Sequence, residues 1–226
     1  MYLEYWLSHS TTAGGIVKLA SATHNSPQLR LKRVVDLAGA VALLILLSPI
    51  LLIAAVLIKA TSRGPMFHAQ KQIGLNQRPF TMWKFRTMIP GAEQYESALR
   101  EIHRADGPFF KVRNDPRVFP VGSFLRKYSI DELPQLINVL KGDMSLVGPR
   151  PLFDFEVAGF DQWKALRRFS MRPGLTCIWQ VSGRSNASSE ARMQYDLEYV
   201  NRWSLWLDFK LLLKTVPIVL KGEGAE

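Results

Sequence analysis

The longest apolar run in the sequence extends from Leu37 to Ile58 and contains no charged residue. As one straight helix it would be roughly 33 Å long, which is about the thickness of the hydrocarbon core of a bilayer. Ser48 and Pro49 interrupt the run near its middle. Because proline removes a backbone donor and clashes with the preceding turn, a kink is expected there.

Basic residues flank both ends of this run: Arg30, Lys32 and Arg33 before it, and Lys59 and Arg63 after it. Cytoplasmic loops of membrane proteins collect Lys and Arg. If both ends are cytoplasmic, the segment must enter and leave through the same leaflet. We therefore predict a re-entrant helix-break-helix membrane anchor over residues 30–60, with an ordinary span that tolerates a proline as the alternative.

The rest of the chain, residues 61–226, consists of short periodic segments separated by Gly and Pro, which predicts a small cytosolic domain. Two short strands are expected in 66–88, around a turn at 74–76. A strand-like run covers 177–183. The expected helices are 91–101, 121–128, 131–140, 154–170 and 188–200. The fold class predicted is α/β, mainly α, with a short sheet.

The two ends of the chain carry different signals. Residues 1–29 are rich in Ser, Thr and Gly, and we predict a poorly ordered lead. The last segment, from residue 201, is amphipathic and rich in Trp and Leu. It is predicted to be an interfacial helix, with core packing as the equally supported alternative.

The composition bounds the function. With 226 residues and 47% apolar residues, the chain is long enough for one well-packed domain. The net charge of +10 suits either nucleic acid or an anionic membrane surface, and the apolar run makes the membrane the simpler partner. No basic-aromatic stripe or known motif supports nucleic-acid binding. The lone cysteine, Cys177, excludes an internal disulfide.

Two adjacent acids, Asp131 and Glu132, are the first candidate for chemistry. If Asp131 is the N-cap of a helix, Pro134 falls in the first turn, where its missing donor costs little. The plain interpretation is therefore helix capping. The functional interpretation is a magnesium site, because two carboxylates suit an oxygen-preferring cation.

Many basic residues in turn-rich or strand-like segments favour the functional interpretation. They are Lys84, Arg86, Arg126, Lys127, Arg150, Arg172 and Arg184. Arg forks match phosphate geometry, so these residues together suggest a site for a nucleotide diphosphate, with one carboxylate free to act as a nucleophile. Arg150 lies between Pro149 and Pro151, which suits a preorganised phosphate clamp. The chain has no P-loop, and its scattered histidines make no zinc spacing.

Several stretches, in order, resemble the bacterial sugar transferase family, the monotopic polyprenyl-phosphate phosphoglycosyl transferases. These are KRVVDLAGA, the Ser48-Pro49 break, KFRTM at 84–88, RKYSIDELPQLINVLKGDMSLVGPRP at 126–151, RPG at 172–174 and WQVSGR at 179–184. The resemblance is strongest to the compact exopolysaccharide-initiating hexose-phosphate transferases. Cys177 departs from the small residue expected in the RPGLTC run.

The resemblance implies transfer of a hexose 1-phosphate, with galactose or glucose as the expected sugar, from a UDP-sugar to undecaprenyl phosphate, with release of UMP. It implies that Asp131 is the nucleophile and that Glu132 binds Mg²⁺. It assigns phosphate or nucleotide contacts to five basic residues. These are Lys84, Arg126, Arg150, Arg172 and Arg184. The implied location is the cytoplasmic face of the bacterial inner membrane.

A different class of protein is also compatible with these residues. A membrane-anchored scaffold would bind nucleotide or lipid without turnover. The sequence leaves open which sugar is transferred and whether the chain forms homo-oligomers.

Overall fold

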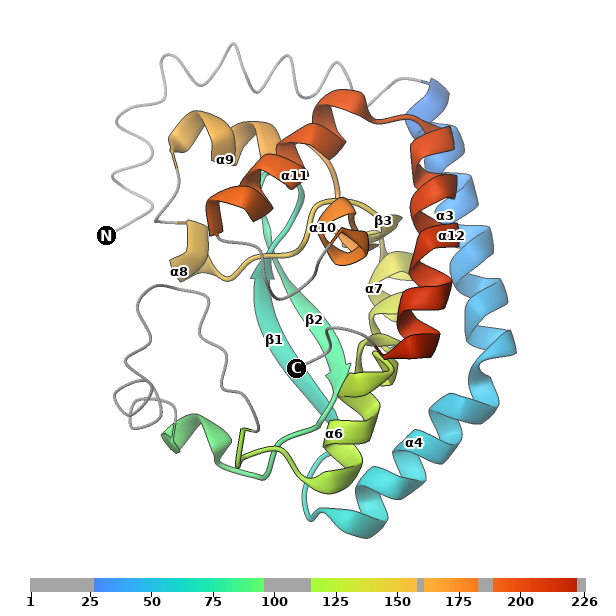
Figure 1. Ribbon diagram of the computed structural model, residues 1–226, viewed down its shortest axis with the longest axis vertical. Coiled ribbons are helices and arrows are strands. Elements are labelled where there is room, and N and C mark those ends of the chain that lie inside the picture. The colour runs from blue at the N-terminus through green and yellow to red at the C-terminus, as the bar shows by residue number, and fades with distance from the viewer. Residues whose placement is uncertain (1–26, 96–114, 158–160, 183–188, 223–226) are drawn as a thin grey trace. The chain divides into compact units, whose positions relative to one another are not determined.

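The computed structural model describes residues 27–95, 115–157, 161–182 and 189–222 (Figure 1). The chain divides into two units, residues 1–35 and 36–226. The described part of the first unit, from residue 27, is the beginning of helix α3. Residues 1–26 of the predicted 1–29 lead lie outside the described residues, as do the site candidate Arg184 and most of the predicted 91–101 helix. The last three residues of that lead, 27–29, belong to helix α3 instead.

The apolar run forms two helices, α3 (Pro27–Leu46) and α4 (Ser48–Thr61), which meet at a bend of 61°. The predicted break is thus confirmed. Pro49 has no N–H to donate to the carbonyl of Ile45, and the Ser48 hydroxyl donates to that oxygen instead at 2.8 Å. Ser48 therefore satisfies the acceptor that the proline leaves open.

Among the described residues, no single helix is both long and apolar enough to cross a bilayer, whereas α3 and α4 meet that criterion together. A broken span and a re-entrant loop share this geometry. Much of the outer surface of α4 is apolar. Its exposed large side chains are Ile50, Leu52, Ile53, Val56 and Leu57.

Two small sheets form in the described part of the chain. The first is an antiparallel hairpin of β1 (Phe67–Ile73) and β2 (Pro79–Phe85), joined by a 3₁₀ turn at Leu75–Gln77, as predicted. The second pairs β3 (Ser145–Val147) with β4 (Gly174–Thr176) in parallel.

The predicted strand at 177–183 is wrong, because β4 ends at Thr176 and Ile178–Val181 forms helix α10. The alternation of apolar residues there is too short to distinguish a strand from a helical turn. Cys177, between β4 and α10, is buried, and burial raises the pKa of its thiol to about 12. The larger side chain is therefore accommodated in a closed interior position.

The helices differ from the predicted ranges in several places. They are η2 (Ala92–Tyr95), α6 (Pro120–Lys127), η3 (Ile130–Glu132), α7 (Gln135–Lys141), α8 (Asp154–Val157), α9 (Gln162–Arg168), α11 (Ser189–Arg202) and α12 (Leu205–Lys221). The single helix predicted over 154–170 is wrong, since α8 and α9 are separate. Asp161 begins α9 by accepting hydrogen bonds from the N–H groups of Trp163 and Lys164.

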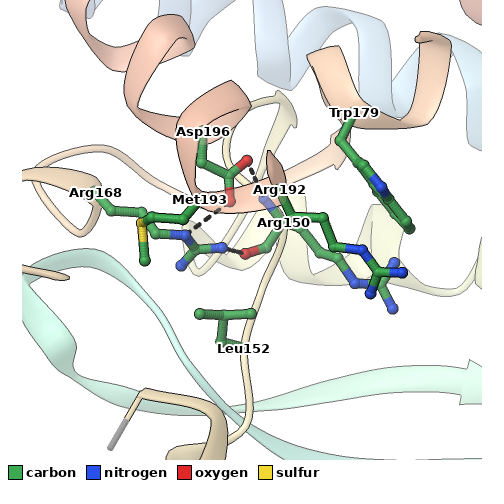
Figure 2. A pocket seen from close by; sticks show the side chains of 7 residues that line it. All are labelled: Arg150, Leu152, Arg168, Trp179, Arg192, Met193 and Asp196. Atoms are coloured by element: carbon green, nitrogen blue, oxygen red, sulfur yellow. Dashed lines mark hydrogen bonds and ion pairs between the residues drawn. The ribbon is translucent and has the colours of Figure 1, made fainter. Parts of the chain in front are cut away.

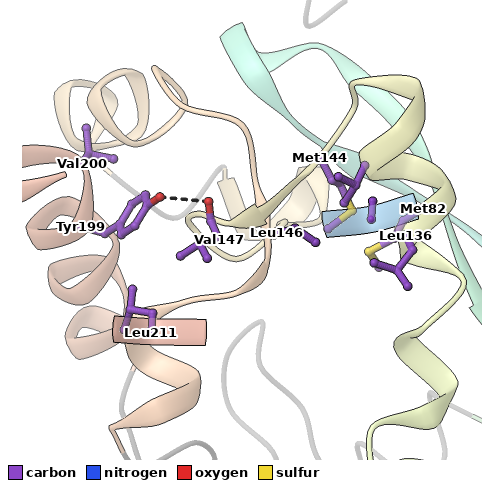
Figure 3. Packing of buried hydrophobic residues seen from close by; sticks show 10 residues of the cluster. Met82, Leu136, Met144, Leu146, Val147, Tyr199, Val200 and Leu211 are labelled. Atoms are coloured by element: carbon purple, nitrogen blue, oxygen red, sulfur yellow. Dashed lines mark hydrogen bonds between the residues drawn. The ribbon is translucent and has the colours of Figure 1, made fainter. Parts of the chain in front are cut away.

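The main core joins α7 and β3 to α11 and α12 (Figure 3). Its buried members are Ala40, Met82, Leu136, Val139, Met144, Leu146, Val147, Tyr199, Val200 and Leu211. Buried hydrogen bonds fix how the elements around this core are placed relative to one another. The Asp36 carboxylate of α3 accepts from the Ser145 hydroxyl and the Leu146 N–H, both at 3.0 Å. The Tyr199 hydroxyl contacts Asp208 at 2.7 Å.

Helix α12 packs one face on this core through Leu211, so the core-packing alternative is correct for that face. A second face is apolar and exposed, which keeps the interfacial prediction open. That face carries Trp206, Phe209, Leu213, Val216 and Leu220. The spacing of these residues by three and four positions places them along one stripe of the helix.

Candidate functional site

Asp131 and Glu132 lie in the short 3₁₀ turn η3, between α6 and α7. The preceding residue, Ser129, has left-handed backbone angles (φ 54°), which are uncommon for a residue other than glycine. Helix α7 begins only at Gln135, with Pro134 as its N-cap. The prediction that Asp131 caps this helix is therefore wrong, because the turn at 130–132 separates both carboxylates from α7.

The two carboxylates have different surroundings. Glu132 lines a cleft and forms an ion pair with the ammonium group of Lys84, on β2, at 2.8 Å. Asp131 is buried, with 8% of its surface exposed, and is not among the residues that line the cleft. Glu132 is therefore the carboxylate presented to a ligand, and Asp131 is its desolvated neighbour.

The pKa of Asp131 is raised from 3.8 to about 7. Burial is the largest cause, followed by repulsion from Glu132, while Lys84 and Arg126 oppose the rise. Strongly perturbed carboxyl groups beside a cleft are characteristic of functional sites. A cation bound between the two carboxylates would relieve part of the repulsion.

Arg126, on α6, connects this turn to the KFRTM segment. Its Nε donates to the Thr87 hydroxyl at 2.9 Å. Burial lowers the pKa of Arg126, and the negative charge of Asp131 counteracts part of that shift. The described geometry thus brings Arg126 into the electrostatic field of Asp131.

The cleft holds about 440 Å³ of space, including solvent at its mouth. Residues from the hairpin, from η3 and α7, and from the GPRP loop meet around it. They are Gln70, Gln72, Met82, Lys84, Glu132, Gln135, Arg150, Pro151, Phe153, Glu156, Gly174, Leu175 and Gln180. The lining combines charged side chains with the neutral amides of four glutamines. The glutamines were missed at the level of sequence, although Gln70 and Gln72 alternate along a predicted strand.

Arg150 lines this cleft and also a second pocket, which Figure 2 shows and which Arg168, Trp179 and Asp196 help to line. The backbone of Arg150 is held at both its N–H and its carbonyl. Its N–H donates to the Asp196 carboxylate at 3.4 Å, and its carbonyl accepts from the Arg168 guanidinium. Arg168 and Asp196 form an ion pair with each other at 2.7 Å. Both side chains are almost completely buried, so the backbone of Arg150 is held by hydrogen bonds with a buried ion pair.

The position of the GPRP loop depends on a close approach between the backbones of Gly148 and Gly174. A Cβ on Gly148 would overlap the Arg172 carbonyl, and a Cβ on Gly174 would overlap the Gly148 nitrogen. Only glycine at these two positions allows β3 and β4 to meet where the GPRP loop begins.

Trp179, on α10, provides an aromatic surface next to this loop. The guanidinium of Arg150 lies 5.0 Å from the centre of its ring, and that of Arg192 lies 4.8 Å from it. Repulsion from Arg150 contributes to the lowered pKa of Arg192, after burial. Two guanidinium groups on the same aromatic ring, with repulsion between them, favour an anion next to them.

Arg86 and Arg172 donate hydrogen bonds to backbone carbonyls outside the cleft. Arg86 donates to the carbonyls of Ser62 and Arg63, at the C-terminal end of α4. The Nε of Arg172 donates to the Gly142 carbonyl at 2.9 Å, where α7 ends, and Arg172 is not among the cleft-lining residues. The structure therefore brings Lys84, Arg150 and Glu132 to one cleft, with Arg126 near the buried Asp131.

Among the described residues, no group of three or more His, Cys, Asp or Glu side chains could hold a metal ion. Mg²⁺, however, is commonly bound by one or two carboxylates together with substrate phosphates and water. The hard oxygen donors of Glu132 and Asp131, next to cationic side chains, fit that mode of binding. The arrangement is typical of a protein that acts on phosphate esters.

Comparison with known proteins identifies the family. The bacterial sugar transferase profile matches residues 27–222, and the chain belongs to this family. It is 40% identical over 201 residues to the exopolysaccharide production protein ExoY of Rhizobium meliloti, covering 86% of this chain and 87% of the relative.

Two further relatives carry names that describe a reaction. A UDP-galactose-lipid carrier transferase of Erwinia amylovora is 40% identical over 234 residues, which is 99% of this chain and 46% of the relative. A UDP-glucose:undecaprenyl-phosphate glucose-1-phosphate transferase of Caulobacter vibrioides is 42% identical over 205 residues, or 86% and 71%. The chain thus spans about half the length of some curated relatives and most of others.

Proposed function

We propose that the protein transfers a hexose 1-phosphate from a UDP-sugar to undecaprenyl phosphate and releases UMP. The observation that carries the proposal is the cleft in which Lys84, Glu132 and Arg150 converge beside the desolvated Asp131. Relatives over nearly the whole chain are named for this chemistry with UDP-galactose or UDP-glucose. The exopolysaccharide name of another relative supports a role in the first membrane step of glycan assembly.

The reaction proceeds in two displacements. A carboxylate oxygen of Asp131 attacks the phosphorus that bears the sugar, a phosphorus–oxygen bond to the other phosphate breaks, and UMP leaves with the electron pair. A phosphate oxygen of undecaprenyl phosphate then attacks the same phosphorus and releases the Asp131 carboxylate. Two steps let one small cleft serve two bulky substrates in turn.

The basic residues make this approach of negative charges feasible. Lys84 and Arg150 neutralise the diphosphate, and Arg126 offsets the charge on Asp131. Glu132, with Asp131 beside it, would hold Mg²⁺, which when bound supplies charge neutralisation on the phosphate oxygens. We retain Arg172 and Arg184 as weaker candidates for nucleotide contacts. A nucleotide contact from Arg172 would have to be made by its terminal guanidinium nitrogens, since its Nε donates to the Gly142 carbonyl.

The membrane anchor places this chemistry where the lipid acceptor lies. We propose that α3 and α4 form a re-entrant hairpin in the cytoplasmic leaflet of the inner membrane. The exposed stripe of α12 would then lie at the head groups. The polyprenyl phosphate keeps its tail in the leaflet, so the enzyme avoids extracting it at about 0.8 kcal/mol for each CH₂.

The decisive experiment incubates the purified full-length protein in nanodiscs with Mg²⁺ and UDP-hexose labelled in the β-phosphate. We expect the label to remain on the protein, at Asp131 by peptide mapping, and UMP to appear in equal amount. Asp131→Asn abolishes both, and Glu132→Gln serves as the comparison carboxylate variant. Label on the Glu132 side chain in the wild-type protein would assign the nucleophile to the other acid.

A membrane-anchored scaffold remains the alternative function. It predicts saturable binding of UDP-sugar or polyprenyl phosphate with no UMP released on any time scale. The same assay with undecaprenyl phosphate, run across a panel of UDP-sugars, separates the two functions and identifies the sugar.

A further inference from the structure

The wall of the cleft formed by strand β1 contains an amide that lacks a partner. Gln72 has 2% of its surface exposed, and its Oε1 has no hydrogen-bond partner among the described residues. Leaving a buried polar atom unsatisfied costs free energy of folding, so such atoms in native proteins require an explanation. Because Gln72 lines the cleft, the explanation nearest at hand is a ligand that supplies the missing partner.

The hairpin register places this amide relative to Lys84. Lys84 is paired with His68, Met82 with Gln70, and Phe80 with Gln72. Successive pairs on one face of a sheet are about 7 Å apart, since the rise is about 3.4 Å per residue. Gln70 therefore lies one row and Gln72 two rows from Lys84, and both face the cleft. Moving along β1 away from Lys84, the residues of this strand that line the cleft are the neutral amides Gln70 and Gln72, and the next residue, Ile73, pairs with Leu152 of the loop that carries Arg150.

The chemistry of this wall selects the ligand. A carboxamide both donates and accepts hydrogen bonds, as does each hydroxyl of a sugar. Phosphate only accepts, and it favours the cationic groups of Lys84 and Arg150. Gln135 of α7, which is also buried, adds a third amide to the lining. The group bonded directly to the attacked phosphorus is the hexose, and it is the part of the donor that would enter this region.

We propose that Gln72, with Gln70 and Gln135, forms the subsite that binds the hexose hydroxyls of the donor. This inference rests on the proposed function, because the phosphate must be held at Lys84 and Arg150 for the sugar to reach the amides. Gln72 is the specificity-determining residue of the subsite, since the buried carbonyl is satisfied only by a correctly placed hydroxyl.

The test replaces Gln72 by methionine, which has a similar length but no hydrogen-bonding amide. With UDP-galactose and UDP-glucose, kcat/KM for the better substrate should fall about tenfold to a hundredfold. The inhibition constant of UMP, which lacks the hexose, should change less than about twofold. Gln94→Leu, at an exposed position outside the cleft, is the matched control and should leave both quantities unchanged.

Stability separates a ligand-binding role from a structural one. Removing an unsatisfied buried amide should raise the melting temperature of the ligand-free protein by about 2–4 °C. A lower melting temperature or an unchanged kcat/KM in Gln72→Met would overturn the proposal. Equal weakening of UMP and UDP-hexose binding would also overturn it, because Gln72 would then contact the uridine and not the hexose. If the wild type releases no UMP, the function proposed above fails independently. The subsite is then tested by calorimetry. The wild-type protein must bind UDP-hexose more tightly than UMP, and Gln72→Met must remove this difference in affinity. Equal affinity of the wild type for the two ligands refutes the subsite.

Discussion

The Lys84–Glu132 pair in the cleft and the Arg168–Asp196 pair at the backbone of Arg150 have nearly equal lengths, 2.8 Å and 2.7 Å. Their surroundings differ. The side chains of the first pair are 18% and 21% exposed, and those of the second are 2% and 6% exposed. Water and ligands therefore reach the first pair, whereas the second is sealed within the protein.

This difference separates two tasks in one site. A hydrated pair can exchange its partner for a metal ion or a phosphate at little cost, because solvent compensates for the separation of the charges. A desolvated pair cannot open without leaving a buried charge, so it holds a fixed geometry. The accessible pair is thus suited to chemistry, and the buried pair is suited to positioning Arg150 through its N–H and carbonyl groups.

The largest effect is expected for Asp196→Asn, which leaves the guanidinium of Arg168 buried without its counter-ion. The free energy of unfolding should fall by about 3–5 kcal/mol. The apolar replacement of both partners, Arg168→Met with Asp196→Leu, should recover most of that loss while kcat stays low, because Arg150 is no longer held. Urea unfolding and UMP release measure the two quantities. A destabilisation below about 1 kcal/mol for Asp196→Asn would show that this pair behaves like the hydrated Lys84–Glu132 pair.

The opposite result is expected at the accessible pair. Glu132→Gln should reduce UMP release about 10²- to 10³-fold, which is typical for the loss of one electrostatic group in an active site. Its free energy of unfolding should change by less than about 1 kcal/mol, since the pair is partly hydrated. Titrating Mg²⁺ should show a weaker apparent affinity in this variant. An unchanged Mg²⁺ dependence would remove the assignment of Glu132 as the metal ligand.

The contrast between the pairs also explains what sequence reasoning found. The acids at 131–132, Lys84 and Arg150 belong to segments with turn or strand signals, and the cleft contains three of these four residues. Arg168 and Asp196 come from α9 and α11, which are far apart in the sequence, and nothing in either helical pattern distinguishes them from surface charges. Their role depends on tertiary packing. The Ser48-Pro49 break was predictable because proline acts on its own turn.

A local propensity was misleading at two other places. Asp131 and Pro134 together resemble a helix start, but the left-handed Ser129 places Asp131 in a separate turn. The run after Thr176 resembles a strand, but β4 ends at Thr176 and Ile178–Val181 forms helix α10. In both cases the backbone around the cleft overrides the local pattern, as is common near functional sites.

The pH dependence should follow Asp131, the desolvated member of the dyad. Its raised pKa of about 7 means that the attacking carboxylate is lost on acidification, so labelling by UDP-hexose should fall about tenfold for each pH unit below 7. The folded pKa exceeds the unfolded value of 3.8, so the folded state binds this proton more tightly. Stability from this group therefore decreases between pH 4 and 7 and levels off above 7.

Single-turnover labelling and thermal unfolding across this pH range test both slopes. Asp131→Asn should remove the labelling and also flatten this part of the stability profile. At pH 8 it should raise the melting temperature, because a buried charge has been removed. A labelling rate that stays constant down to pH 5 would show that Asp131 is ionised throughout, contrary to its desolvated position.

The smallest expected effect is the coupling between Lys84 and Glu132 in the free energy of unfolding. A double-mutant cycle with Lys84→Met and Glu132→Gln should give less than about 1 kcal/mol, and raising the salt concentration should reduce it further. The corresponding cycle with Arg168→Met and Asp196→Leu should give several times that value and respond little to salt, since ions do not reach a sealed pair. Equal coupling energies, or equal responses to salt, would mean that exposure does not distinguish the two pairs. Lys84 and Glu132 would then hold the hairpin against η3 as a structural contact, and the charge that meets the donor phosphate would have to come from Arg150 and the other arginines instead of Lys84.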